Sequence, residues 1–347
     1  MSGEKKERMS ASPSTRKPEE KGTRSSVFFS AFNLRQLFAL VAGVVILAIV
    51  PGFQDAYYTS FFFTMLFYII LAEAWVIFSG YTGYVNLGPV AAVGAGAFIM
   101  AYLQDQLPFI LILLISALAG VGLAFVVGLP SLRIRGAYFA ILTLGVAVIL
   151  QLVVLNVGIS TTGTIARTVI GPSRNELYYY LVVLTPVSII ITHVLRKSKM
   201  GLGLISIRSD EEAAEATGIN TTWYKLAAFA ISFAIMGMMG PILASRLSYI
   251  DPYGAFNPLL SFEVVVMAVL GGSGDALGPI LGSVLISTLS EVLSTSYPFQ
   301  YEIILGAILI IVVLAAPRGL SGIYQSLVAK SAPSKVEEDT KVQPKLR

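Results

Sequence analysis

The sequence predicts an all-α fold, a polytopic bundle of about eight to ten transmembrane helices with room for broken or re-entrant helices. Of its 347 residues, 55% are hydrophobic and only 13% are charged, and the mean hydropathy is +0.77. A soluble domain of this composition could not cover its apolar side chains with polar surface. Several apolar runs also approach or reach the length of about 20 residues that a helix needs to cross a bilayer. Membrane lipid is therefore the expected surrounding of most of the chain.

The apolar runs place the spans in order along the chain. We expect spans near residues 37–53, 58–79, 85–104, 109–129, 137–157, 177–195 and 226–247. The first run lacks a small-residue cleavage pattern, so we expect an uncleaved span there rather than a signal peptide. A less regular region at 261–292 is either two short spans or a re-entrant hairpin, and a last span is expected at 301–316.

Polar tails flank the membrane region and indicate its orientation. Residues 1–33 and 326–347 contain few apolar residues, so we expect two disordered tails around a transmembrane domain at 34–325. Basic residues gather in the N-terminal tail, around Arg133 and in the loop 196–225. The positive-inside rule places these parts in the cytoplasm, and the basic C-terminal tail is expected there too.

The composition also excludes several functions. The net charge of +4 comes from tails and loops, so membrane orientation explains it and nucleic-acid binding is not expected. The absence of cysteine excludes disulfides and thiolate metal sites, and we expect neither a metal nor a cofactor. His193 lies near the end of a span and is expected to be an interfacial residue rather than a proton carrier. No phosphate loop and no catalytic constellation is present, so the chain is not expected to hydrolyse ATP.

The loop 196–225 carries the most informative local pattern. Ser209 is followed three residues later by Glu212, which is typical of a capping box with reciprocal bonds between each side chain and the other residue's amide. We therefore expect a short helix on the cytoplasmic face that begins at Asp210. Alanines sustain it, and Gly218 can adopt the left-handed conformation that closes a helix.

Several motifs together resemble a known family. Glu212-Ala213-Ala214 with Gly218 is similar to the EAA-x3-G element of ABC importer permeases. The run from Arg133 to Leu144, then Val269–Gly274 with Leu277-Gly278-Pro279, and finally Pro317-Arg318-Gly319-Leu320 resemble the branched-chain amino acid permease family of the LivM type. The resemblance covers about residues 57–323. Asn86-Leu87-Gly88-Pro89 departs from it, because relatives tend to show Ser-Leu-Gly and then a polar or small residue, and this leaves the ligand open.

The resemblance implies a permease subunit in the cell membrane that imports branched-chain or related amino acids. The short cytoplasmic helix would dock into an ATP-hydrolysing subunit and transmit its closure to the spans. The residues expected to serve this coupling are Ser209, Asp210, Glu211, Glu212, Ala213, Ala214 and Gly218. The implied partners are ABC ATPase subunits, a second homologous permease and an extracellular or periplasmic solute-binding protein. The outer loop Thr161–Glu176 either meets this binding protein or is a solvated loop.

Polar residues and glycines in the apolar runs are candidates for the translocation path. Burying an unpaired polar group in a membrane is costly, so such residues should face the bundle interior or water. The candidates are Glu73, Asn86, Gly88, Gln151, Asn156, Glu263 and Gly274; Glu73 and Glu263 are alternatively interfacial. The pattern Gly80-x-x-Gly83 with Leu87-Gly88-Pro89 is similar to Gly271-x-x-Gly274 with Leu277-Gly278-Pro279. It predicts either broken helices around a substrate path or two unrelated helix-packing sites.

Other functions remain open at this point. The nearest alternative is a permease of the same superfamily for a sugar, a nucleoside, urea or a short amide. An ion-coupled secondary transporter would work alone and would need intramembrane acidic or histidine relays, of which the sequence has few. A membrane enzyme is the third alternative, and no nucleophile–base pair or metal-ligand set supports it.

Overall fold

The computed structural model describes residues 34–53, 56–134, 136–272, 274, 276–297, 300, 303–304 and 306–307. Both predicted tails, the motif Pro317–Leu320 and most of the span expected at 301–316 lie outside the described residues. The elements are α2 (Leu34–Ile49), the 3-10 turn η1 (Val50–Phe53), α3 (Ala56–Trp75), the π-helical turn η2 (Val76–Gly80), α4 (Pro89–Leu103), α5 (Phe109–Ser131), α6 (Ala137–Thr162), β1 (Arg167–Thr168), α7 (Arg174–Lys197), α8 (Lys199–Ser209), α9 (Glu211–Ala216), α10 (Thr221–Leu247), β2 (Tyr249–Ile250), α11 (Pro252–Ala255), α12 (Pro258–Gly271) and α13 (Leu277–Ser296).

The described part of the chain is a polytopic membrane helix bundle, as predicted. It holds seven helical segments long and apolar enough to cross a membrane, namely Tyr57–Gly80, Phe109–Ser131, Ala137–Ser160, Arg174–Lys197, Thr221–Leu247, Pro252–Gly271 and Leu277–Ser296. Two shorter apolar helices are Leu40–Gly52 and Pro89–Leu103. The region 261–292 forms two separate helices, α12 and α13, and each belongs to an apolar segment of 20 residues. This favours two spans over a re-entrant hairpin.

Helices α3 and α10 form the centre of the bundle. In the most apolar 18-residue stretches of their spans, 78% and 72% of the residues are buried inside the bundle, whereas in α6 only 17% are. Helix α6 therefore lies at the edge. Glycines bring α10 into backbone contact with its neighbours. A Cβ atom on Gly96 of α4 would lie 2.1 Å from the carbonyl oxygen of Gly237, and one on Gly120 of α5 would lie 2.2 Å from that of Phe233. The core of α4, α5 and α10 therefore depends on small residues where these helices meet.

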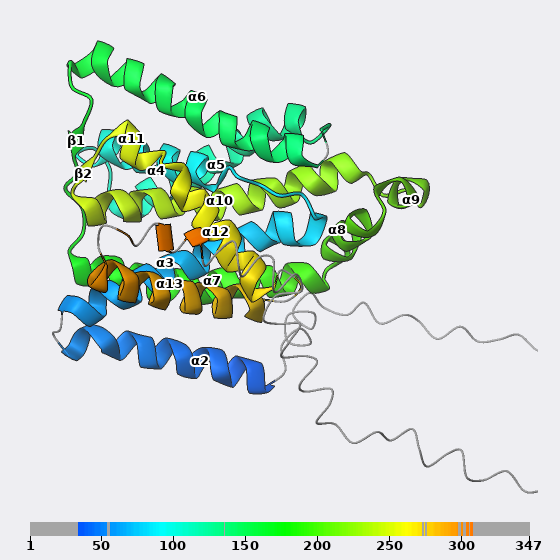
Figure 1. Cartoon of the computed structure of the whole chain (residues 1–347), viewed down its shortest axis with the longest axis horizontal. Coiled ribbons are helices and arrows are strands. Elements are labelled where there is room, and N and C mark those ends of the chain that lie inside the picture. Colours follow the sequence, from blue (N-terminus) through cyan, green and yellow to red (C-terminus); the bar gives the residue numbers. More distant parts are fainter. Residues whose placement is uncertain are drawn as a thin grey trace, which may run out of the picture.

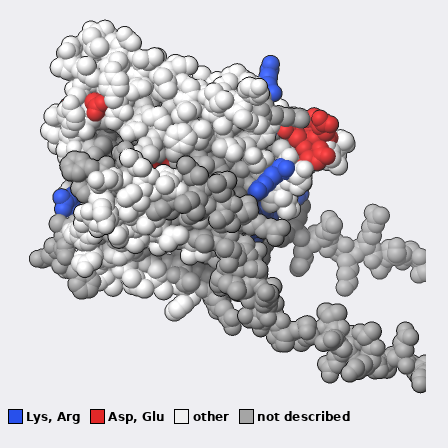
Figure 2. Space-filling model, in the orientation of Figure 1, with Lys and Arg blue, Asp and Glu red and all other residues white. Residues whose placement is uncertain are grey.

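The two ends of the bundle have different structures (Figure 1). The antiparallel pair β1–β2 and α11 lie at one end, and α8 and α9 lie at the other. The Nζ atom of Lys225 in α10 donates to the carbonyl oxygen of Leu132 at 3.3 Å, so the Arg133 loop lies at the α9 end. This agrees with the prediction that Arg133 and the loop 196–225 share one side of the membrane. Figure 2 shows acidic and basic side chains gathered at the α9 end, with a largely uncharged lateral surface beside them.

A helix break lies within each of the two similar glycine-proline motifs, Gly80–Pro89 and Gly271–Pro279. After η2 the chain is not helical through residues 83–88, so the span predicted to begin at residue 85 instead begins at Pro89. Pro279 lies in the first turn of α13. At the second motif the glycines also pack helices together, because a Cβ atom on Gly271 would lie 1.8 Å from the carbonyl oxygen of Gly278. The first motif thus interrupts a helix inside the bundle, and the second holds two helices in contact.

Candidate functional site

The candidate site begins with helix α9 and the residue that caps it. Asp210 is the N-cap, and its Oδ1 atom accepts hydrogen bonds from the amides of Glu212 and Ala213, both at 3.0 Å. The predicted capping box is therefore wrong. Ser209 is the last residue of α8, and its hydroxyl donates to the carbonyl oxygen of Ile205 at 3.1 Å. Asp210 has the extended backbone that an N-cap requires, with φ −160° and ψ 110°, which directs its carboxylate over the first turn.

The other end of α9 closes as predicted. Gly218 has φ +89°, and the amide of Ile219 donates to the carbonyl oxygen of Ala214 at 3.2 Å, the bond of a Schellman motif. Ala214 is buried, whereas Glu212, Ala213, Glu215 and Ala216 are exposed. The acidic side chains form the red patch on α9 in Figure 2. Helix α9 thus presents an acidic surface beyond the end of the bundle.

A polar cluster of Tyr84, Glu211 and Lys225 joins α9 to the bundle. Lys225 is 2% exposed, and its Nζ atom lies 2.5 Å from Oε1 of Glu211. The Tyr84 hydroxyl donates to Oε2 of Glu211 at 2.8 Å, and the Lys225 ammonium lies 4.9 Å from the centre of the Tyr84 ring. These contacts connect three segments that are far apart in the sequence: α9, α10 and the chain between η2 and α4.

Arg208 makes a second connection beside the polar cluster. Its Nη1 atom donates to the carbonyl oxygen of Gly80, the last residue of η2, at 2.6 Å. An open groove of about 650 Å³ runs along this junction, lined by the chain after η2, the start of α6 and the end of α8. Helices α8 and α9 are therefore both attached to the end of the broken helix α3–η2.

The non-helical chain leads from Tyr84 directly to Asn86, which is fully buried. The Oδ1 atom of Asn86 accepts from the amide of Gly88 at 2.8 Å, and its carbonyl oxygen accepts from Nε1 of Trp75 at 2.8 Å. The Nδ2 group of Asn86 is buried and has no hydrogen-bond partner among the described residues. Unsatisfied buried donors are rare in folded proteins, so this amide is a donor that a passing solute could use.

Gly88 lies beside Asn86 in the tightest part of this turn. A Cβ atom at this position would lie 3.0 Å from Oδ1 of Asn86 and 3.2 Å from Cζ of Phe233 in α10. The amide of Leu87 donates to Oγ1 of Thr143 in α6 at 3.0 Å. Asn86 and Gly88 thus lie together where α3, α6 and α10 contact the start of α4.

The other predicted path residues lie in different places. Glu73 is fully buried in α3, and Glu263 is 8% exposed in α12, where its Oε2 atom accepts a hydrogen bond from the Tyr68 hydroxyl. Gln151 is half-buried on α6. Asn156 is exposed on the same helix, with its Nδ2 group donating to the carbonyl oxygen of Leu152 at 2.7 Å. Gly274 is exposed, and a Cβ atom added there would have nothing within 4 Å. Asn156 and Gly274 are therefore not part of the buried group around Asn86.

Sequence reasoning missed Tyr84 and Lys225. In the sequence Lys225 is only one of the basic residues of the loop 196–225 that indicate orientation, and no local pattern singles out Tyr84. The position of Lys225 at the start of a long apolar run, where a charge is costly to bury without a partner, was the available signal. The described residues contain no group of three or more His, Cys, Asp or Glu side chains that could hold a metal ion.

Comparison with known proteins identifies the family. The model of the branched-chain amino acid transport system / permease component matches residues 57–314. The high-affinity branched-chain amino acid transport system permease protein LivM of Salmonella typhimurium is 29% identical over 79% of this chain and 72% of its own length. LivM of Escherichia coli is 28% identical over 83% and 75%. The ribose import permease protein RbsC of Haemophilus influenzae is 29% identical over 36% of this chain and 40% of its own.

No solved structure shows significant similarity to the chain. The family model nevertheless spans well over half of its residues, from the second residue of α3 to beyond the end of α13. The chain therefore belongs to the family of branched-chain amino acid transport system permease components.

Proposed function

We propose that the chain is the transmembrane permease subunit of an ABC importer that translocates branched-chain or related amino acids. As a permease component it is not itself catalytic, so ATP hydrolysis would take place in partner subunits. The observation that carries the proposal is the polar cluster, because it connects an exposed acidic helix to the buried turn at Asn86. A second permease and an extracellular solute-binding protein complete the proposed assembly.

The contacts suggest how motion would pass through the chain. An ATPase subunit that grips α9 would move Glu211, which is bonded to both Lys225 and Tyr84. Tyr84 lies two residues before Asn86, so its displacement would move the turn that opens α4. Because Lys225 is buried and paired, the cluster should move as a unit rather than separate. The proposed path therefore opens at Asn86 and Gly88 when α9 is displaced.

Uptake measurements test the substrate class. The full assembly in proteoliposomes is expected to accumulate radiolabelled leucine only when ATP is supplied to the ATPase side. Similarity to a ribose permease over part of the chain supports a second candidate, a sugar importer, so ribose uptake is measured in parallel. Transport of ribose without leucine would replace the amino acid by a sugar. Leucine transport on an ion gradient with the purified chain alone would instead show a secondary transporter.

Charge reversal on α9 tests the coupling role. Glu212 is exposed in the first turn of α9, so Glu212→Lys is expected to leave the bundle folded. It should lower ATP-driven uptake by about tenfold or more, since charge complementarity fixes how such surfaces dock. The matched control is Asp105→Lys, an exposed acid in the loop at the opposite end, which should transport normally. Equal uptake by both variants would remove the coupling role from α9.

A further inference from the structure

A second cavity lies at the end of the bundle opposite α9. It has a volume of about 430 Å³ between α3, α7, α10 and the strand segments, and its lining includes Ser60, Phe63, Val169, Arg174, Leu177 and Arg246. We call it the arginine pocket. Its volume is within the usual range for small-molecule sites, about 300–1,000 Å³. By the predicted orientation it opens toward the outside of the cell.

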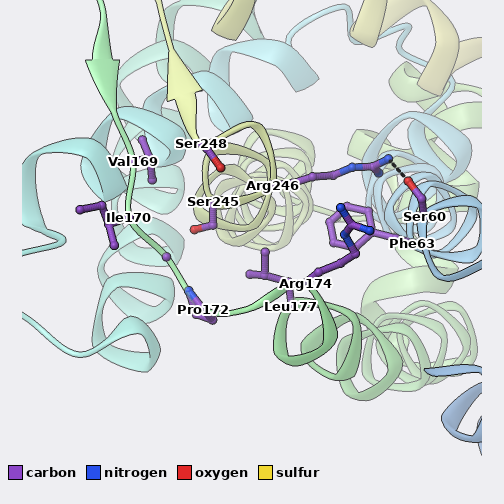
Figure 3. A pocket seen from close by; sticks show the side chains of 11 residues that line it. Ser60, Phe63, Val169, Ile170, Pro172, Arg174, Leu177, Ser245, Arg246 and Ser248 are labelled. Carbon is purple, nitrogen blue, oxygen red and sulfur yellow. Dashed lines mark hydrogen bonds between the residues drawn. The ribbon is translucent and has the colours of Figure 1, made fainter. Parts of the chain in front are cut away.

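Two guanidinium groups define one side of the arginine pocket. Figure 3 shows Arg174 from α7 and Arg246 from α10 reaching to the same side, near Phe63 and Ser60. Arg246 is held in place, because it donates to Oγ1 of Thr64 at 2.8 Å and to Oγ of Ser60 at 3.0 Å. Its guanidinium carbon lies 4.4 Å from the centre of the Phe63 ring. Arg246 is thus a fixed cation rather than a mobile surface side chain.

The described lining of the pocket contains no carboxylate that pairs with these cations. None of its lining residues is acidic, and no carboxylate of the described residues lies within salt-bridge distance of Arg174 or Arg246. Arg174 repels the charge of Arg246, whereas Tyr68 and Glu291, which both lie outside the pocket lining, favour it. The nearby carboxylate of Glu176 is already engaged, since it accepts from the amide of Ser173 at 2.7 Å. An anion entering the pocket would therefore relieve the repulsion between the two cations.

The remaining walls suit an apolar side chain. Val169 and Leu177 are each no more than 4% exposed and line the pocket together with Pro172. A small solute with a carboxylate at one end and an aliphatic group at the other would match both sides. A neutral sugar has no anionic group to pair with the arginines.

We propose that the arginine pocket binds the carboxylate of a small aliphatic solute before it moves into the bundle. Arg174 and Arg246 pair with the carboxylate oxygens, and the apolar wall contacts the aliphatic group. The inference deepens the proposed import function, on which it rests for the direction of movement, and it favours a carboxylate-bearing solute over a neutral sugar.

Equilibrium binding without nucleotide tests this site separately from transport. The chain, assembled with its partner subunits in phosphatidylcholine nanodiscs, is incubated with radiolabelled leucine. 4-Methylpentanoate, which keeps the carboxylate and the branched chain, should compete. Leucinamide, which lacks the carboxylate, and ribose should not. Competition by leucinamide as strong as that by 4-methylpentanoate, or no binding of leucine at all, would overturn the proposal.

Arginine variants locate the binding. Arg174 makes no hydrogen bond among the described residues, so Arg174→Gln should fold normally and weaken leucine binding about tenfold or more. Arg246→Lys keeps the positive charge but loses the paired donors of the guanidinium group, and it should weaken leucine binding less. The matched control is Arg167→Gln at the same end of the bundle, because Arg167 lies outside the pocket, 3.8 Å from the centre of the Tyr102 ring. The leucine affinity of this variant should stay within about twofold of that of the unsubstituted chain. Equal affinities of all variants would overturn the site.

The carboxylate could also come from an acidic side chain of a docking protein. Capture of the solute-binding protein is therefore measured with the same variants. Weaker capture by Arg174→Gln with unchanged leucine affinity would assign the pocket to protein docking and overturn the solute site. ATP-driven uptake of leucine is measured separately. If the assembly imports leucine and Arg174→Gln binds leucine as tightly as the unsubstituted chain, only this inference is overturned. If the pocket binds the carboxylate but the assembly imports no leucine, only the proposed import function is overturned.

Discussion

Replacing Lys225 by methionine is expected to abolish coupling between α9 and the bundle. The change keeps the length of the side chain but removes a buried ammonium that lies 2.5 Å from Glu211. Leaving one member of a buried ion pair without its partner costs about 3 kcal/mol or more. We therefore expect a lower unfolding temperature for Lys225→Met in detergent and at least about a tenfold loss of ATP-driven uptake.

A double variant separates stability from coupling. Lys225→Met combined with Glu211→Gln removes both charges, so much of the lost stability should return. Uptake should stay low, because the ionic link from α9 to the turn before α4 is still missing. The control is Lys199→Met, which removes an exposed cation at the start of α8 and should change neither quantity. Normal uptake by the double variant would show that the polar cluster only stabilises the fold.

The second large effect is expected from one added methyl group on α5. A Cβ atom on Gly120 would lie 2.2 Å from the carbonyl oxygen of Phe233, so Gly120→Ala must push α5 away from α10. Contacts with backbone cannot be relieved by a side-chain rotation, and we expect a loss of about 3 kcal/mol. Thermal unfolding followed by tryptophan fluorescence, together with size-exclusion profiles, would measure it.

Gly122 provides the matched control for this prediction. It lies on the same helix only two residues away, yet nothing is within 4 Å of a Cβ atom there. Gly122→Ala should be neutral or stabilising by about 0.5–1 kcal/mol, because alanine restricts the unfolded chain more than glycine does. If both substitutions had the same effect, the close contact between α5 and α10 would be disproved.

Local features of this fold could be predicted from the sequence. The apolar runs gave the order of the helices, because span length depends on the thickness of the bilayer rather than on tertiary contacts. Gly218 was predicted to close α9, since a glycine after a run of alanines is the residue best able to adopt the left-handed conformation that ends a helix. The N-cap was assigned one residue too early. Ser209 and Asp210 are both good caps, and only the course of α8 decides between them.

Features that depend on distant contacts could not be predicted. Tyr84 and Lys225 are separated by 141 residues, and no local pattern indicates that they share Glu211. The polar residues of apolar runs looked equivalent in the sequence, yet Asn86 is fully buried and Asn156 is exposed. Their roles in the path stay predictions. The position of α6 at the edge of the bundle accounts for the difference, and it follows from packing rather than from hydropathy.

Helix α10 links the two ends of the bundle mechanically, because Lys225 and Arg246 both lie on it. They are 21 positions apart, close to 30 Å at about 1.5 Å per residue. A tilt imposed from the α9 end therefore changes the spacing of the two guanidinium groups at the far end. Pro241 lies between Lys225 and Arg246 and cannot donate an amide proton to the carbonyl of Gly237. The missing hydrogen bond makes α10 easier to bend at the level where it contacts α4. A displacement of α9 on one side of the membrane can then weaken binding in the arginine pocket on the other side.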